Sequence, residues 1–249
     1  MSGIVKVLEI TIHGGYNLIS NPINNLIVRL IMWWNYKKTN FSAGGLLPTR
    51  LVKCAKNTLK TAKKFVAPRK LDFRDMCLEP SNQGSTPHCA GYATAGYIEV
   101  QNWRTNHYPE QIDGDAIYIE AKRIDNNLED GTTLESAANA AISLGLISGT
   151  PKLINSGVND IKFAIHSYSV CVAGFNITNE WNYVDSKGAI RNLGSKAQFL
   201  GGHAVLICGY DADGVYIQNS WGSSWGLYGF VHLSWSQYSR QFMYGLVIV

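Results

Sequence analysis

The chain of 249 residues carries a thiol, an imidazole and a side-chain amide in three distinctive runs: His-Cys-Ala-Gly at Cys89, Gly-Gly-His-Ala-Val at His203 and Gln-Asn-Ser-Trp-Gly at Asn219. A free thiol is only a few per cent ionised near neutral pH, so it needs a base to act as a nucleophile. The imidazole of His203 can take the thiol proton and later protonate a leaving group. The amide oxygen of Asn219 can fix which ring nitrogen carries the proton. These side chains therefore predict covalent catalysis by a thiolate–imidazolium pair.

Two further features surround Cys89. Gln83 supplies a side-chain NH2 six residues earlier. Together with the backbone N–H of Cys89, it is a candidate donor to the oxyanion of a tetrahedral intermediate. Pro87 precedes a run rich in small residues, which predicts a helix over 89–105. A cysteine at the start of a helix gains thiolate stability from the helix dipole.

From residue 68 to residue 249 the chain resembles the papain-like cysteine peptidases, in a disulfide-poor form of the bacterial or viral type. The most specific run is Asn-Ser-Trp-Gly-Ser-Ser-Trp-Gly, which starts at Asn219. The other runs that carry the resemblance are Leu71-Asp72-Phe73-Arg74, Gln83-Gly84, Cys89, Gly131-Thr132, Gly202-His203-Ala204-Val205 and Gly209-Tyr210. Two positions depart from the family pattern: Thr86, where a cysteine is usual, and Ala90, where a tryptophan is usual.

The resemblance implies a role for each matching residue. Cys89 would be the nucleophile, His203 the base, Asn219 the group that orients the base, and Gln83 the oxyanion donor. Four more residues would line or shield the substrate site: Gly131 and Thr132 through backbone contacts, Ala204 at the pocket for the second residue before the scissile bond, and Trp221 over the His203–Asn219 hydrogen bond. The implied substrate is a polypeptide, with no metal and no cofactor.

The elements that must position these residues change type along the chain. Helical patterns occupy 89–105, 115–126 and 133–145, and a Thr132-Thr133-Leu134-Glu135 capping box opens the third. Strand patterns follow at Ser169–Ile177, His203–Tyr210, Val215–Asn219, Gly229–Ser234 and Tyr244–Val249, with a hairpin turn at Asp211–Gly214. We therefore expect an α+β, papain-like two-lobe fold, with a helical lobe at about 85–150 and an antiparallel β-barrel-like lobe at about 155–249.

Charge divides the chain near the start of the resemblance. Residues 1–71 hold twelve Lys and Arg and one acid, a formal net charge of +11, whereas residues 72–249 have a net charge of −7. We therefore expect a basic N-terminal extension at 1–67 and a peptidase domain at 68–249. Within the extension five lysines recur at helical spacing and could form one face of a helix: Lys53, Lys56, Lys60, Lys63 and Lys64.

Four hypotheses fit residues 1–67. The extension is a propeptide that covers the acidic catalytic domain, a nucleic-acid-binding arm, a segment that lies on an anionic membrane, or a solvated arm that docks on an assembly partner.

The cysteine content bears on the compartment. Five cysteines with no paired spacing indicate reduced thiols and a reducing compartment such as the cytoplasm, with incorporation in a virus particle as a further possibility. The first residues lack the pattern of a secretory signal, so the chain is not classically secreted. No CxxC or His–Cys cluster suggests a metal site.

The sequence thus predicts a thiol-dependent endopeptidase, a hydrolase that forms a thioester acyl-enzyme on Cys89. The alternative is a structural protein associated with nucleic acid or a particle, which retains the papain-like fold and is anchored by its basic arm. A third hypothesis is transpeptidation or deamidation on the same side chains, since all three reactions pass through one thioester.

Overall fold

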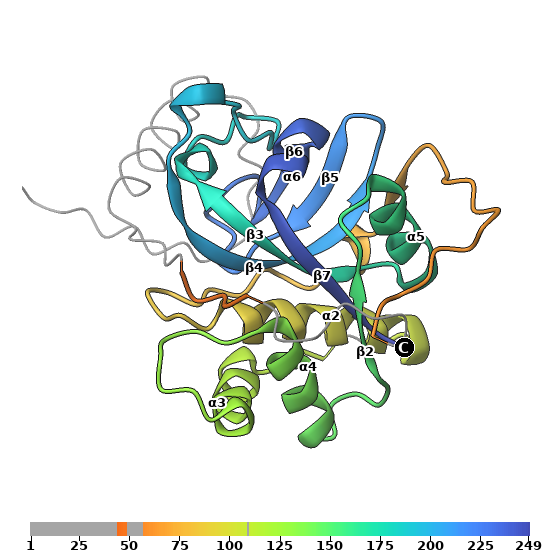
Figure 1. Cartoon of the computed structure of the whole chain (residues 1–249), viewed down its shortest axis with the longest axis vertical. Coiled ribbons are helices and arrows are strands. Elements are labelled where there is room, and N and C mark those ends of the chain that lie inside the picture. Colours follow the sequence, from red (N-terminus) through yellow and green to blue (C-terminus); the bar gives the residue numbers. More distant parts are fainter. Residues whose placement is uncertain (1–43, 49–56, 109) are drawn as a thin grey trace, which may run out of the picture. The chain divides into compact units, whose positions relative to one another are not determined.

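Helices dominate the first half of the described chain and strands dominate the second half (Figure 1). The computed structural model describes residues 44–48, 57–108 and 110–249. In chain order its elements are β1 (Leu71–Asp72), the 3-10 helix η1 (Arg74–Met76), α2 (Cys89–Asn106), α3 (Gly114–Asp125), α4 (Leu134–Ser143), β2 (Pro151–Ile154), α5 (Val158–Tyr168), β3 (Cys171–Thr178), η2 (Asn179–Asn182), η3 (Gly194–Lys196), β4 (Phe199–Tyr210), β5 (Gly214–Gln218), β6 (Phe230–Ser234), α6 (Trp235–Gln241) and β7 (Phe242–Ile248).

The strands form one antiparallel sheet in the order β2-β7-β3-β4-β5-β6, and β1 pairs with β4 beside this path. Strands β3 and β4 are almost continuously buried. Helix α2 packs against both of them, and so does α5, which explains why their residues do not alternate between apolar and polar types. Three helices, α2, α3 and α4, gather on one side of the molecule away from α5 and α6 (Figure 1). The predicted α+β, two-lobe fold is confirmed.

Small residues let α2 sit in the centre of the fold. At Gly91 an added Cβ would lie 2.2 Å from the carbonyl oxygen of Gly114, the first residue of α3. Contacts this short leave no room for a side chain, so Gly91 lets the first turn of α2 touch the start of α3. The first three residues of α2, from Cys89 to Gly91, are consequently buried.

The three predicted helices correspond to α2, α3 and α4, and the predicted hairpin turn is confirmed by a hydrogen bond from Asp211 N–H to Gly214 O. The cap of α4 differs from the prediction. Thr133, not Thr132, is the N-cap, and its hydroxyl accepts from the N–H of Ser136. The hydroxyl of Thr132 instead donates to Asp125, so the predicted capping box does not form.

Besides the short 3-10 helices, three elements had no prediction: β2, α5 and α6. Strand β2 is four residues long, and α6 is a seven-residue helix between two strands, so neither gives a clear period. Helix α5 starts after Gly157 without a side-chain cap, so it lacks the usual start signal. None of the helices that the structure describes is long and apolar enough to cross a membrane.

The predicted basic helix is wrong in its described part. Residues 57–59 run extended beside β2, where Leu59 N–H donates to Leu153 O and Leu153 N–H donates to Asn57 O. These residues therefore pair through their backbone with the free edge of β2 and do not form the helix that the lysine spacing predicted. Residues 49–56, with Lys53 and Lys56, and most of the predicted extension lie outside the described residues. The boundary at residues 67 and 68 stays a prediction.

Candidate active site

The nucleophile candidate, Cys89, is the first residue of α2 and has no exposed surface. Burial raises the pKa of its thiol to about 11, against the opposing effect of the backbone N–H groups of Ala204 and Ala90. The thiol therefore lies at the start of one lobe and beside a backbone group from β4 of the other. In this environment it is a neutral thiol at physiological pH.

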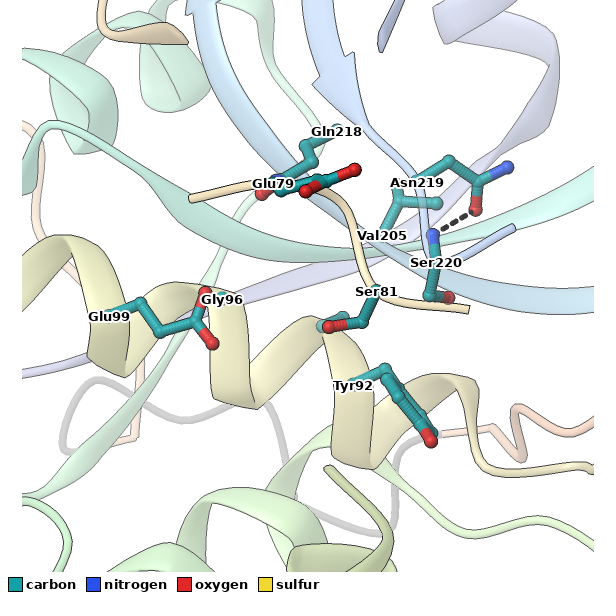
Figure 2. A pocket seen from close by; sticks show the side chains of 10 residues that line it. Glu79, Ser81, Tyr92, Gly96, Glu99, Val205, Gln218, Asn219 and Ser220 are labelled. Carbon is teal, nitrogen blue, oxygen red and sulfur yellow. Dashed lines mark hydrogen bonds between the residues drawn. The ribbon is translucent and has the colours of Figure 1, made fainter. Parts of the chain in front are cut away.

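The imidazole of His203 is held by the end of the next strand. Its Nε2 lies 2.8 Å from Oδ1 of Asn219, which follows β5. The same oxygen accepts from the N–H of Ser220 at 2.8 Å, drawn as a dashed line in Figure 2, so Nε2–H must be the donor to it. In the neutral ring Nδ1 then carries the lone pair, and it has no hydrogen-bond partner among the described residues. Nδ1 is consequently the nitrogen that is ready to accept a proton.

Burial also sets the charge state of the imidazole. His203 has no exposed surface, and desolvation lowers its pKa to about 4, although the Asn219 hydrogen bond opposes this. Cys89 and His203 are thus both neutral in this form of the protein, because a low-dielectric site disfavours separated charges.

Aromatic rings cover the His203–Asn219 pair. Trp221 stacks on the imidazole at 4.8 Å between ring centroids, and Trp181 meets its edge at 6.2 Å. Trp225 stacks on Trp181 and completes the layer. Both members of the hydrogen bond, His203 and Asn219, are buried beneath these rings. Trp221 was predicted here, whereas Trp181 was not, since it lies in η2 with no motif around it to mark it.

The expected oxyanion donor, Gln83, joins the segment before Cys89 to the segment after Asn219. Its Oε1 accepts from the hydroxyl of Ser220 at 2.6 Å, and its Nε2 donates to Thr86 O at 2.8 Å. An amide nitrogen has two protons, so one N–H remains for a ligand. The side chain is buried and fixed at both ends.

The residues expected to line the substrate site contact a segment of the chain itself. Thr132 N–H donates to Gly45 O at 3.0 Å, and Leu47 N–H donates to Thr132 O at 2.9 Å. On the other side, Gly202 O accepts from the N–H groups of Gly44 and Leu46. Residues 44–47 therefore lie between Thr132 and Gly202, the neighbour of His203, and Leu46 forms an isolated β-bridge with Thr132.

Close packing accompanies these bonds. At Gly131, where φ is +86°, an added Cβ would lie 2.3 Å from Gly45 O, and a Cβ on Gly45 would lie 2.3 Å from Pro87 O. Leu46 is 4% exposed and lies over Gly174, the residue that pairs with Ala204. The position of residues 44–48 could not be predicted, because no pattern in them points to a binding partner.

His88, the neighbour of Cys89, is directed elsewhere. Its Nδ1 lies 2.7 Å from Asp115 Oδ1, and its ring stacks on Tyr118. It therefore ties the start of α2 to α3.

A separate small cavity of about 20 Å³ lies between α2 and the residues around Asn219 (Figure 2). Its lining includes the buried carboxyl of Glu99, whose pKa is raised by burial and which accepts from the N–H of Ile112. Among the described residues no group of three or more His, Cys, Asp or Glu side chains is arranged to hold a metal ion.

Comparisons with known proteins agree with this fold. The model of the papain family cysteine proteases matches residues 121–243, which include His203 and Asn219. Xylellain, a cysteine protease from Xylella fastidiosa, is 19% identical with a TM-score of 0.71, over 84% of this chain and 96% of its own. Procathepsin L 3 of Tenebrio molitor is 16% identical with a TM-score of 0.61, over 94% of both chains.

A third similar structure is procathepsin B S9 from Trypanosoma congolense, 13% identical with a TM-score of 0.65, over 83% of this chain and 86% of its own. No curated protein matches the chain. The family match over residues 121–243 and the shared fold support assignment of the chain to the papain-like cysteine peptidases, which are hydrolases.

Proposed function

We propose that the chain is a cysteine endopeptidase in which Cys89 forms a thioester with its substrate. The observation that carries this proposal is the orientation of His203, with Nε2–H bonded to Asn219 and Nδ1 left to accept a proton. Cys89 opens α2, so its thiolate would gain from the helix dipole once water or substrate enters the site.

The reaction proceeds in two halves. His203 Nδ1 takes the proton of the Cys89 thiol, and the thiolate attacks the scissile carbonyl. The imidazolium then protonates the leaving amine, which departs and leaves the thioester. In the second half His203 takes a proton from water, the hydroxide attacks the thioester, and Cys89 leaves as the thiolate. Gln83 Nε2–H and the Cys89 backbone N–H donate to the oxyanion in both halves.

We further propose that residues 44–48 hold this site closed. They occupy the backbone positions on Thr132 and Gly202 that an extended substrate would use. Leu46 is itself buried in this position, over Gly174 of β3. Two of the similar structures are proforms by name, which supports the propeptide hypothesis among the four for the N-terminal extension.

Trapping the intermediate tests the proposed reaction. Full-length protein is mixed with an unstructured polypeptide substrate under reducing conditions, quenched in acid and measured by intact mass. We expect a peptide adduct on wild type that maps to Cys89, with no adduct on Cys89→Ala. Cleavage that persists in Cys89→Ala overturns the proposed nucleophile. If neither the folded wild type nor the Leu46→Asp variant gives an adduct or cleavage, the structural alternative is favoured.

A further inference from the structure

Two thiols, those of Cys77 and Cys208, lie near the place where β1 joins the sheet. Strand β1 pairs with the end of β4, with Leu71 opposite Tyr210 and Asp72 opposite Gly209. The next residue, Phe73, donates its N–H to Cys208 O at 2.9 Å. The segment that follows β1 therefore begins next to the backbone of Cys208.

The chain then turns back on itself. In η1 the N–H of Cys77 donates to Arg74 O, and the thiol of Cys77 lies 3.6 Å from Phe73 O. Cys77 and Cys208 thus contact the same backbone unit, Phe73, from two sides. This brings two residues that are far apart in the sequence to one place.

A bulge in β4 sets the direction of Cys208. The register runs from Ile207 opposite Ile217 to Gly209 opposite Tyr216, so Cys208 has no partner on β5. Bulges re-aim a side chain in this way. The Cys208 thiol lies 3.5 Å from Tyr216 O and is close enough to the Cys77 thiol for the two groups to interact electrostatically.

The two thiols differ in access. Cys208 is buried, whereas Cys77 is partly exposed. Burial raises the pKa of the Cys208 thiol well above its usual range and the neighbouring Cys77 adds to this, whereas the guanidinium of Arg74 acts in the opposite sense. A partly exposed thiol that an external disulfide can reach, next to a buried second thiol on the same backbone unit, is the arrangement of a thiol–disulfide exchange site.

We propose that Cys77 and Cys208 are a modification site that exchanges with a low-molecular-weight disulfide of the glutathione type and closes into a Cys77–Cys208 disulfide. Cys77 attacks one sulfur of the external disulfide, which forms a mixed disulfide and releases one thiol. Cys208 then attacks the Cys77 sulfur and releases the second thiol. The two protein thiols are oxidised, the external disulfide is reduced to two thiols, and the two protein protons go to these leaving groups.

The disulfide would tie the segment that leads to Gln83 to the strand that carries His203. It would close a long loop across both lobes, and so it would restrict the unfolded chain. The inference does not depend on the proposed role of Cys89, because neither thiol contacts the active site.

The test uses full-length protein with Cys89→Ala, so that the active-site thiol does not react. Oxidised glutathione is added, and the products are measured by intact mass and by peptide mapping without reduction. We expect the loss of two hydrogens and a Cys77–Cys208 cross-linked peptide. The unfolding midpoint should rise by about 10 °C and return on reduction.

Variants separate the two steps. Cys208→Ala should stop at a glutathione adduct on Cys77, and Cys77→Ser should show neither adduct nor cross-link at this site. Cys171→Ala, which removes another buried thiol, should cross-link as the parent does. The inference is overturned if the parent keeps a stable adduct on Cys77 without closing, or if Cys77 or Cys208 cross-links to a different cysteine.

Discussion

The two sides of the active site are held in different ways. On the helical side Cys89 depends on position and burial, at the first turn of a helix packed through small residues. On the strand side His203 depends on a network of a hydrogen bond to Asn219 and stacked rings from Trp221 and Trp181. The thiol side therefore has one irreplaceable atom, whereas the imidazole side divides its task among several residues.

The largest expected effect is on the thiol side. Cys89→Ala should lower peptidase activity by about 10⁴-fold or more, because no other nucleophile lies at the start of α2. The thermal unfolding midpoint should stay within a few degrees, since alanine fits the buried first turn. Turnover and a melting curve on the same preparation check both parts, and retained activity would contradict the role of Cys89.

A smaller loss is expected on the strand side. Asn219→Ala should lower turnover by about 10²-fold, because the ring loses its orienting acceptor but keeps its aromatic cover. Steady-state kinetics beside Cys89→Ala measure the difference. Equal losses of turnover in Asn219→Ala and Cys89→Ala would show that the task of holding His203 is not divided among several residues.

Trp221→Phe should cost less, roughly 3- to 10-fold, because a smaller ring still stacks on His203 but lets water reach the Asn219 bond. Trp181→Phe is the matched variant, since Trp181 meets the imidazole only at its edge. We expect it to be milder. A loss at Trp181 that exceeds the loss at Trp221 would reverse the order of the two contacts.

The packing of α2 gives a stability prediction. Gly91→Ala should lower the free energy of unfolding by about 1–3 kcal/mol, because the added Cβ meets Gly114 O at 2.2 Å. Gly96→Ala is the matched control in the same helix, where the nearest atoms are at 3.4 Å. Chemical denaturation compares the two, and equal effects would argue against tight packing at Gly91.

The smallest expected effect is the pH dependence of Glu99. Its pKa is raised by burial, so the stability that its neutral form contributes is present at low pH and is lost as the pH rises through the folded-state value. Glu99→Gln should flatten this dependence above about pH 4.5. Unfolding midpoints from pH 4 to 8 measure it, and a variant curve parallel to that of wild type would contradict the assignment.

The sequence predicted the catalytic side chains better than the contacts that surround them. The order of Cys89, His203 and Asn219 in specific runs, and the period change from helix to strand, predicted the fold and the residues of the candidate site. Local patterns do not encode the partners that a side chain meets across the fold. For this reason Trp181 was missed, the lysine spacing at 57–64 misled, and the placement of Leu46 had no signal.

Covalent labelling with a thiol-directed peptide epoxide tests the central claim most directly, read by intact mass at pH 7 on the full-length protein. We expect slow labelling of wild type, because burial raises the pKa of Cys89, and none of Cys89→Ala. Leu46→Asp should label about 10- to 30-fold faster, since a charge does not fit the buried position, whereas Val66→Asp, at an exposed position, should match wild type. Labelling that is independent of Cys89 would contradict the proposed nucleophile, and equal rates for Leu46→Asp and Val66→Asp would contradict the closed site.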